Sequence, residues 1–213
     1  MSEISSLTGY SRSHVAKLLA TLRGEGMVTQ GASRKYRISE RVFRLGNQFV
    51  RVSPLAPLAL PVMQDLSART GHSVTMTVRE GHEILHLMAV DGPKFPECRW
   101  RVGQRISHHT SAAARVLLAF MPERRVSLIF RARGLPRLTE RTITDPETFR
   151  SALREVRRQG AAFTASEGVP GLAGLAVPIM DRDDEVPAAL AVIAPEQVLS
   201  EAERETLRAS MWR

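Results

Sequence analysis

Two groups of residues in this chain have the types and spacing of known catalytic sites. The first, His82-Glu83-Ile84-Leu85-His86, has the H-E-x-x-H spacing with which zinc peptidases hold a metal ion and activate water. That chemistry requires a helix, where residues four apart lie about 6 Å from each other. Gly81 precedes the motif at a predicted turn, and the flanking residues alternate between apolar and polar, so the sequence predicts a strand. Residues four apart in a strand are separated by about 13 Å, too far for one zinc ion, and a peptidase is the least favoured function.

The second group is His108-His109 beside Thr110 and Ser111, which could supply a nucleophile and its base. No Gly-x-Ser-x-Gly turn or third catalytic group accompanies them. A nucleophilic site is therefore not favoured for this group. The single cysteine, Cys98, excludes an internal disulfide and a cysteine-based zinc cluster. We expect a protein that is not an enzyme and that holds neither a metal nor a cofactor.

Positive charge is concentrated in the first quarter of the chain. The 213 residues carry a net charge of +8, and residues 1–53 contain nine basic and three acidic residues, a net charge of +6. The remaining 160 residues therefore carry only +2. This distribution indicates a polyanionic partner for the N-terminal quarter; the alternative is a solvated basic face without a partner. No apolar run approaches the ~20 residues needed to span a bilayer, and we expect a cytoplasmic protein without membrane contact.

The first fifty residues have the pattern of two helices joined by a tight turn. Residues 11–25 predict a helix with Ser11 as its cap, and the turn before it contains Gly9. The apolar residues of that helix recur at spacings of three and four, which predicts one buried stripe formed by Val15, Leu18, Leu19 and Leu22. The opposite face carries groups suited to phosphates and base edges, namely Arg12, Ser13, His14 and Lys17.

A hairpin and a third helix follow. Residues 27–30 and 34–38 predict two short strands around a glycine-containing turn, with Arg34 and Lys35 near its tip. A hairpin in this position is a wing, and its tip could contact a DNA backbone or minor groove; simple solvation is the alternative. Residues 39–53 predict a connecting helix that ends at Pro54.

The rest of the chain predicts an α+β domain of mixed strands and flanking helices. Helical spacing is present in residues 58–70, 111–120 and 146–159, and a last helix begins at Ser200. Strands are predicted at residues 74–78, 84–90, 99–102, 172–179 and 187–193.

Over almost its whole length the chain resembles the IclR family of bacterial transcription regulators. The segments that carry the resemblance are Leu7 to Leu22, Gly26-Met27-Val28, Tyr36-Arg37-Ile38, Arg44-Leu45-Gly46, Gly103-Gln104-Arg105, His109 to Ala112, Leu153 to Gly160 and Ala176-Val177-Pro178-Ile179. The resemblance implies a winged helix-turn-helix in residues 1–38, a linker helix in 39–53 and a GAF-like effector-binding domain in 54–213. It also implies a homodimer or a dimer of dimers. In the resemblance His109 opens a packed helix, which implies a structural, hydrogen-bonding role for this residue. The family's first helix is missing, which suggests an N-terminally shortened form, and the final helix is expected to be short too.

The resemblance also implies where a small-molecule effector binds. Sensors of small carboxylic acids in this family have small residues at the start of the helix after the histidine, where this chain has Ser111, Ala112 and Ala113. Their acidic, cysteine and serine positions are occupied here by Thr164 or Ala165, by Gly174, and by Ala191 and Ile193. We therefore predict an effector that is larger or more apolar than a short 2-oxo acid. The alternative is a degenerate pocket without a ligand.

The sequence thus predicts a regulator that binds double-stranded operator DNA under the control of a small-molecule effector. Arg12, Ser13, His14 and Lys17 are expected to enter the major groove, while Arg34 and Lys35 hold the backbone. The alternative is a shortened ligand-binding or dimerisation module that no longer binds DNA.

Overall fold

The computed structural model describes residues 1–94 and 102–211, apart from the side chains of residues 49 and 50. Cys98 and most of the strand predicted at 99–102 lie outside the described residues, and Val102 lies in a turn. The chain divides into two compact units, Met1–Pro57 and Leu58–Arg213. No helix in the described parts of either unit is long and apolar enough to cross a membrane.

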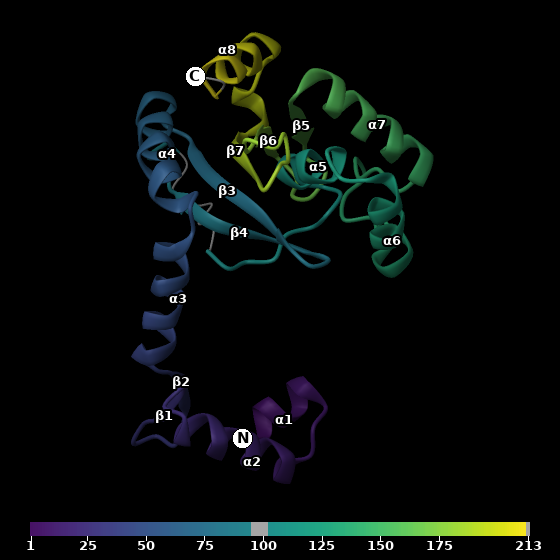
Figure 1. Cartoon of the computed structure of the whole chain (residues 1–213). Coiled ribbons are helices and arrows are strands. Elements are labelled where there is room, and N and C mark those ends of the chain that lie inside the picture. The colour runs from purple at the N-terminus through teal and green to yellow at the C-terminus, as the bar shows by residue number, and fades with distance from the viewer. Residues whose placement is uncertain (95–101, 212–213) are drawn as a thin grey trace. The chain divides into compact units, whose positions relative to one another are not determined.

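The N-terminal unit consists of helices and one hairpin (Figure 1). Its elements are α1 (Ser2–Thr8), α2 (Arg12–Gly24), β1 (Val28–Gln30), β2 (Tyr36–Ile38) and α3 (Glu40–Val52). Gly9, with φ 72°, ends α1, and the hydroxyl of Ser11 caps α2 by accepting from the backbone N–H of His14 at 3.3 Å. The two strands pair antiparallel, with Val28 opposite Ile38.

The apolar stripe of α2 is buried only in part. Val15 and Leu19 are 2% and 7% exposed, as the periodicity predicts. The prediction that Leu18 and Leu22 are buried is wrong, because they are 44% and 41% exposed. Periodicity identifies the apolar face of a helix, whereas burial also requires another element to cover that face. The described residues leave this side of α2 uncovered.

The C-terminal unit is built on one antiparallel sheet with the strand order β4-β3-β7-β6-β5. The strands are β3 (Ser73–Glu80), β4 (Glu83–Val90), β5 (Ala162–Ala165), β6 (Leu172–Ile179) and β7 (Ala188–Pro195). The pairing of β3 with β4 contains an irregularity between Met76 and Thr77, which are opposite Met88 and His86. Every strand that the sequence predicts among the described residues is present, and β5 is an additional edge strand.

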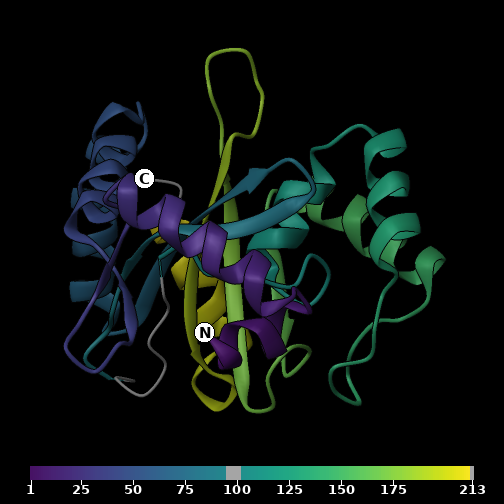
Figure 2. The same ribbon diagram turned by 90° about the horizontal axis from the view of Figure 1, so that it is seen from below.

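Helices cover both sides of this sheet. Their bounds are α4 (Ala56–Thr70), α5 (Ala112–Ala119), α6 (Glu123–Arg133), α7 (Pro146–Gln159) and α8 (Glu201–Met211), with a short 3-10 turn at Glu196–Val198. Figure 2 shows α5, α6 and α7 on one side and α4 on the other. The helix predicted at residues 146–159 is present, and Ser200 caps α8 by accepting from the N–H of Glu203 at 3.3 Å.

A floor of small residues lets α5 lie close to the sheet. Because side chains alternate along a strand, Gly174 and Ala176 of β6 share one face with Ala189 and Ala191 of β7. The three alanines are at most 2% exposed and belong to the same core as the alanines at the start of α5. A Cβ at Gly174 would lie only 3.5 Å from the Cβ of Ala112. Small side chains on both elements therefore set this close packing.

Candidate functional site

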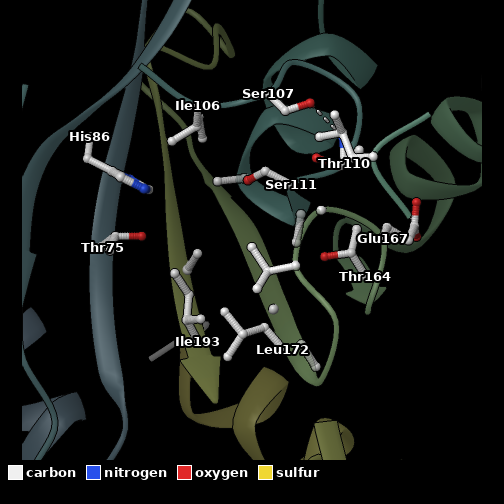
Figure 3. Close-up of a pocket in the computed structure, with 18 of the residues that line it drawn as sticks. Thr75, His86, Ile106, Ser107, Thr110, Ser111, Thr164, Glu167, Leu172 and Ile193 are labelled. Carbon is white, nitrogen blue, oxygen red and sulfur yellow. Dashed lines mark hydrogen bonds between the residues drawn. The ribbon is translucent and has the colours of Figure 1, made fainter. Parts of the chain in front are cut away.

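The C-terminal unit contains a cavity of about 260 Å³ beside the first turn of α5 (Figure 3). The small-residue face of the sheet forms one wall, and segments 104–113 and 164–169 form the others. Apolar side chains supply much of the lining, namely Ile106, Leu138, Val169, Leu172 and Ile193. Such a cavity, apolar with a few polar groups, is typical of small-molecule binding sites.

Six of the seven residues that the resemblance assigns to an effector site line this cavity. They are Ser111, Ala112, Ala113, Gly174, Ala191 and Ile193. Ala165 is not among the lining residues, whereas Thr164, the other candidate for the acidic position, is one of them. Successive side chains of a strand point to opposite faces, so only one of these two β5 residues can face α5. Thr164 is that residue, because its Oγ1 would lie 3.6 Å from a Cβ at Gly174.

The sheet wall carries two buried polar side chains, Thr75 and His86, that the sequence analysis did not assign to the site. They are 0% and 2% exposed, and both line the cavity. The Oγ1 of Thr77 lies 3.1 Å from Nδ1 of His86, at hydrogen-bond distance. Burial lowers the pKa of His86 to about 4, because a charged imidazole would lose its hydration there. His86 is therefore neutral at pH 7. The H-E-x-x-H motif lies in a turn and in β4, as predicted, and not in a helix.

His108 and His109 hold the segment before α5 to a neighbouring loop. Nε2 of His108 lies 2.9 Å from the carbonyl oxygen of Gly134, and Nε2 of His109 lies 2.9 Å from that of Pro136. A carbonyl oxygen can only accept, so both Nε2 atoms donate. Burial lowers the pKa of both rings. Nδ1 of His109 is then free to accept from the hydroxyl of Ser107, 3.1 Å away. These hydrogen bonds are consistent with the structural role predicted for His109.

A buried ion pair supports the loop that forms the outer wall. The carboxylate of Glu167 pairs with the guanidinium of Arg115 in α5, and the two side chains are 11% and 5% exposed. Arg115 also donates from Nε to the carbonyl oxygen of His109 at 3.1 Å. Burial raises the pKa of Glu167, and the charge of Arg115 opposes that rise. The sequence analysis missed Glu167, which lies close to the position where an acidic residue was sought, but its carboxylate is already paired.

Two further contacts fix the backbone of this loop. The hydroxyl of Thr142 donates to the carbonyl oxygen of Glu167 at 2.7 Å. A Cβ at Gly168 would lie 2.8 Å from Oγ1 of Thr110, so any larger residue would have to displace the Thr110 side chain before α5. The loop that forms the outer wall of the cavity therefore packs closely against the segment that leads into Ser111 and Ala112.

The residues predicted to bind DNA are all exposed on the N-terminal unit. Arg12, Ser13, His14 and Lys17 lie in the first turns of α2. Arg34 and Lys35 lie between β1 and β2, and Arg34 has φ 56°, a turn conformation. The ring of Tyr10 lies 4.9 Å from that of His14, between their centroids.

An antiparallel sheet covered by helices defines the C-terminal unit as an α+β domain, and its mostly apolar cavity is a candidate site for a small molecule. Residues 47–212 match the family model described as "Bacterial transcriptional regulator IclR C-terminal". The chain therefore belongs to the IclR family, and its C-terminal unit has the α+β fold of that family's effector-binding domain.

Characterised relatives of the chain are transcriptional regulators rather than enzymes. The regulator KdgR of Escherichia coli is 31% identical over 202 residues, which cover 94% of this chain and 77% of KdgR. The regulator XynR of the same organism is 27% identical over 209 residues, covering 98% of this chain and 83% of XynR. Among solved structures, an IclR homologue from Microbacterium hydrocarbonoxydans in complex with 4-hydroxybenzoate is 28% identical. It superposes with a TM-score of 0.83 over 98% of this chain and 86% of its own.

Proposed function

We propose that this chain is a cytoplasmic transcriptional regulator whose binding to double-stranded operator DNA is modulated by a small molecule held in the cavity. Residues 1–38 act as a winged helix-turn-helix, 39–53 as a linker helix and 54–213 as the GAF-like effector-binding and oligomerisation domain. The active form is a homodimer or a dimer of dimers. The observation that carries the proposal is the cavity beside α5 in a chain that belongs to a family of transcriptional regulators.

The DNA-binding part of the proposal rests on exposed positive charge. Arg12 and Lys17 are exposed on α2, and Arg34 and Lys35 are exposed in the hairpin turn between β1 and β2. A recognition helix with such groups contacts bases and phosphates in the major groove, and a wing contacts the adjacent backbone. Ser13 and His14 add hydrogen-bonding groups to the same turn of α2.

A gel shift on DNA upstream of the chain's own and neighbouring genes, at two salt concentrations, tests this part. Each lost phosphate contact should reduce the slope of log affinity against log salt by about 0.9. We expect Lys17→Ala to weaken binding and flatten that slope, whereas Arg182→Ala, an exposed cation in the turn before β7, should leave both unchanged. If both variants weakened binding equally, the affinity for DNA would depend on the net charge of the chain and not on a contact made by Lys17.

A ligand-binding module without DNA binding is the second candidate function. It is favoured by the small buried core of the N-terminal unit, where the buried hydrophobic residues among those described are Val15, Leu19 and Ala56. Absence of specific DNA binding by this chain, with binding by a form extended at its N-terminus, would support this alternative.

The effector part of the proposal rests on the size and lining of the cavity. About 260 Å³ lies just below the range of about 300–1,000 Å³ for drug-sized ligands, so a short 2-oxo acid would leave most of the space unfilled. The relative that binds 4-hydroxybenzoate is consistent with a ring-containing effector.

A thermal-shift comparison of ring-containing acids with pyruvate tests this expectation. A ligand at a hundred times its dissociation constant stabilises by about 2.7 kcal/mol, which should raise the Tm by roughly 5–10 °C in a chain of this size. Ile193→Phe, which fills the cavity at a half-buried position, should abolish the shift. Stabilisation by pyruvate alone would contradict the proposed effector class.

A further inference from the structure

The hydroxyl of Thr75 is buried and has no hydrogen-bond partner among the described residues. Thr75 is 0% exposed, yet its Oγ1 makes no hydrogen bond there. Thr77, two residues along the same strand and also 0% exposed, has Nδ1 of His86 3.1 Å from its Oγ1. Buried polar groups in proteins are nearly always paired, so an orphaned hydroxyl at the wall of a cavity calls for a partner inside the cavity.

The residues directly opposite Thr75 on the neighbouring strands have no group that could be that partner. Thr75 is opposite Ala89 of β4 and opposite Ala191 of β7, so the adjacent side chain on each strand is a methyl group. Alternation places Thr75 on the face of the sheet that forms the cavity wall. Figure 3 shows Thr75 and His86 on one side of the cavity, with Ser111 and Thr164 across from them.

The surroundings of Thr75 select an uncharged group. The described strand residues that line the cavity are His86 and residues without ionisable side chains, and His86 is neutral at pH 7 because burial lowers its pKa. Arg105 also lines the cavity, but its side chain is 72% exposed and its Nε lies 3.9 Å from a carboxylate oxygen of Glu83. A carboxylate placed at the sheet wall beside Thr75 would therefore lose its hydration without a buried cation to pair with, which is unfavourable. A hydroxyl, carbonyl or amide group would instead exchange its hydrogen bonds with water for one with Oγ1 of Thr75.

We propose that Thr75 is a specificity-determining residue that binds an uncharged hydrogen-bonding group of the effector at the sheet wall of the cavity. This inference rests on the proposed function, because it assumes that the cavity holds the effector. It adds that the effector carries a hydroxyl, carbonyl or amide group in addition to its apolar part.

The first test needs no ligand and compares Thr75→Val with Thr77→Val by thermal unfolding. Valine has nearly the shape of threonine, so each variant removes one buried hydroxyl at constant volume. Removing an unpaired hydroxyl should leave the Tm unchanged or raise it, whereas removing the Thr77 hydroxyl breaks its hydrogen bond with Nδ1 of His86 and should lower the Tm by several degrees. An equal fall in both variants would show that the hydroxyl of Thr75 is already satisfied, and would overturn the proposal.

The second test uses phenol and toluene, which differ by a hydroxyl in place of a methyl group. In titration calorimetry the wild-type chain should bind phenol more tightly than toluene. Thr75→Val should lower the affinity for phenol by about tenfold and leave the affinity for toluene unchanged or higher. Equal binding of both probes to the wild-type chain would overturn the role of Thr75 but would still support the cavity as the effector site. Binding of neither probe overturns the effector cavity and this inference together.

Discussion

The buried imidazole of His86 should make the C-terminal unit sensitive to mild acid. Its pKa falls from the ordinary 6.5 to about 4 on folding, a difference of about 2.5, and burial is the cause. Between these two values the unfolded chain binds a proton that the folded chain does not. The contribution of neutral His86 to the free energy of unfolding is therefore fully present above pH 6.5 and is lost as the pH falls toward 4. Since one pKa unit corresponds to 1.36 kcal/mol, the full loss is about 3 kcal/mol, of which about 2 kcal/mol has gone by pH 5.

Urea denaturation at pH 7 and pH 5, followed by circular dichroism, measures this loss. His86→Asn is the informative variant, because an asparagine amide takes the place of Nδ1 beside Thr77 and does not titrate. Burial also lowers the pKa of His72, His108 and His109, so both proteins retain part of the pH dependence. The variant should lose about 2 kcal/mol less than the wild-type chain between the two pH values. Identical losses would refute the depressed pKa of His86.

Two other predictions concern stability. Arg115→Met should destabilise the fold by about 3–5 kcal/mol in urea denaturation, since it leaves the carboxylate of Glu167 buried without its ion-pair partner. Adding Glu167→Gln should recover part of this loss. A smaller loss than that caused by Arg69→Met, which breaks the exposed pair with Asp65, would contradict this prediction. Gly92→Ala should cost about 3 kcal/mol, because its Cβ would lie 2.2 Å from the backbone carbon of His72. Gly174→Ala, with its nearest contact at 3.5 Å, should be neutral or stabilising by less than about 1 kcal/mol, and a similar Tm fall in both glycine variants would argue against these contacts.

Local patterns predict those elements whose signals lie close together in the chain. The helix at Pro146–Gln159 has a capping aspartate at 145, apolar residues at the right spacing and a glycine with φ 68° at its end. In contrast, α6 was not predicted, because its charged residues obscure the short apolar stripe of Val126, Ile129 and Phe130. The edge strand β5 has only four residues, too few to show alternation clearly.

The candidate site depends on contacts that a single sequence does not show. The alternation of β3 was recognised, but that Thr75 lies beside Ala191 follows from the pairing of β3 with β7, which are far apart in the chain. The paired state of Glu167 likewise depends on Arg115, 52 residues away. The positions taken from the family resemblance were more informative, since all but Ala165 line the cavity.

The alanine and glycine floor beneath α5 makes the candidate site of this domain easy to change in evolution. Each floor position carries at most a methyl group, and the sheet beneath it is held by backbone hydrogen bonds that do not depend on side-chain identity. Replacement of Ala191 by serine, reached by one nucleotide change from any alanine codon, would therefore add a polar group while the backbone stays in place. New ligand preferences can thus arise by single substitutions, which also makes the floor a natural starting point for engineered biosensors.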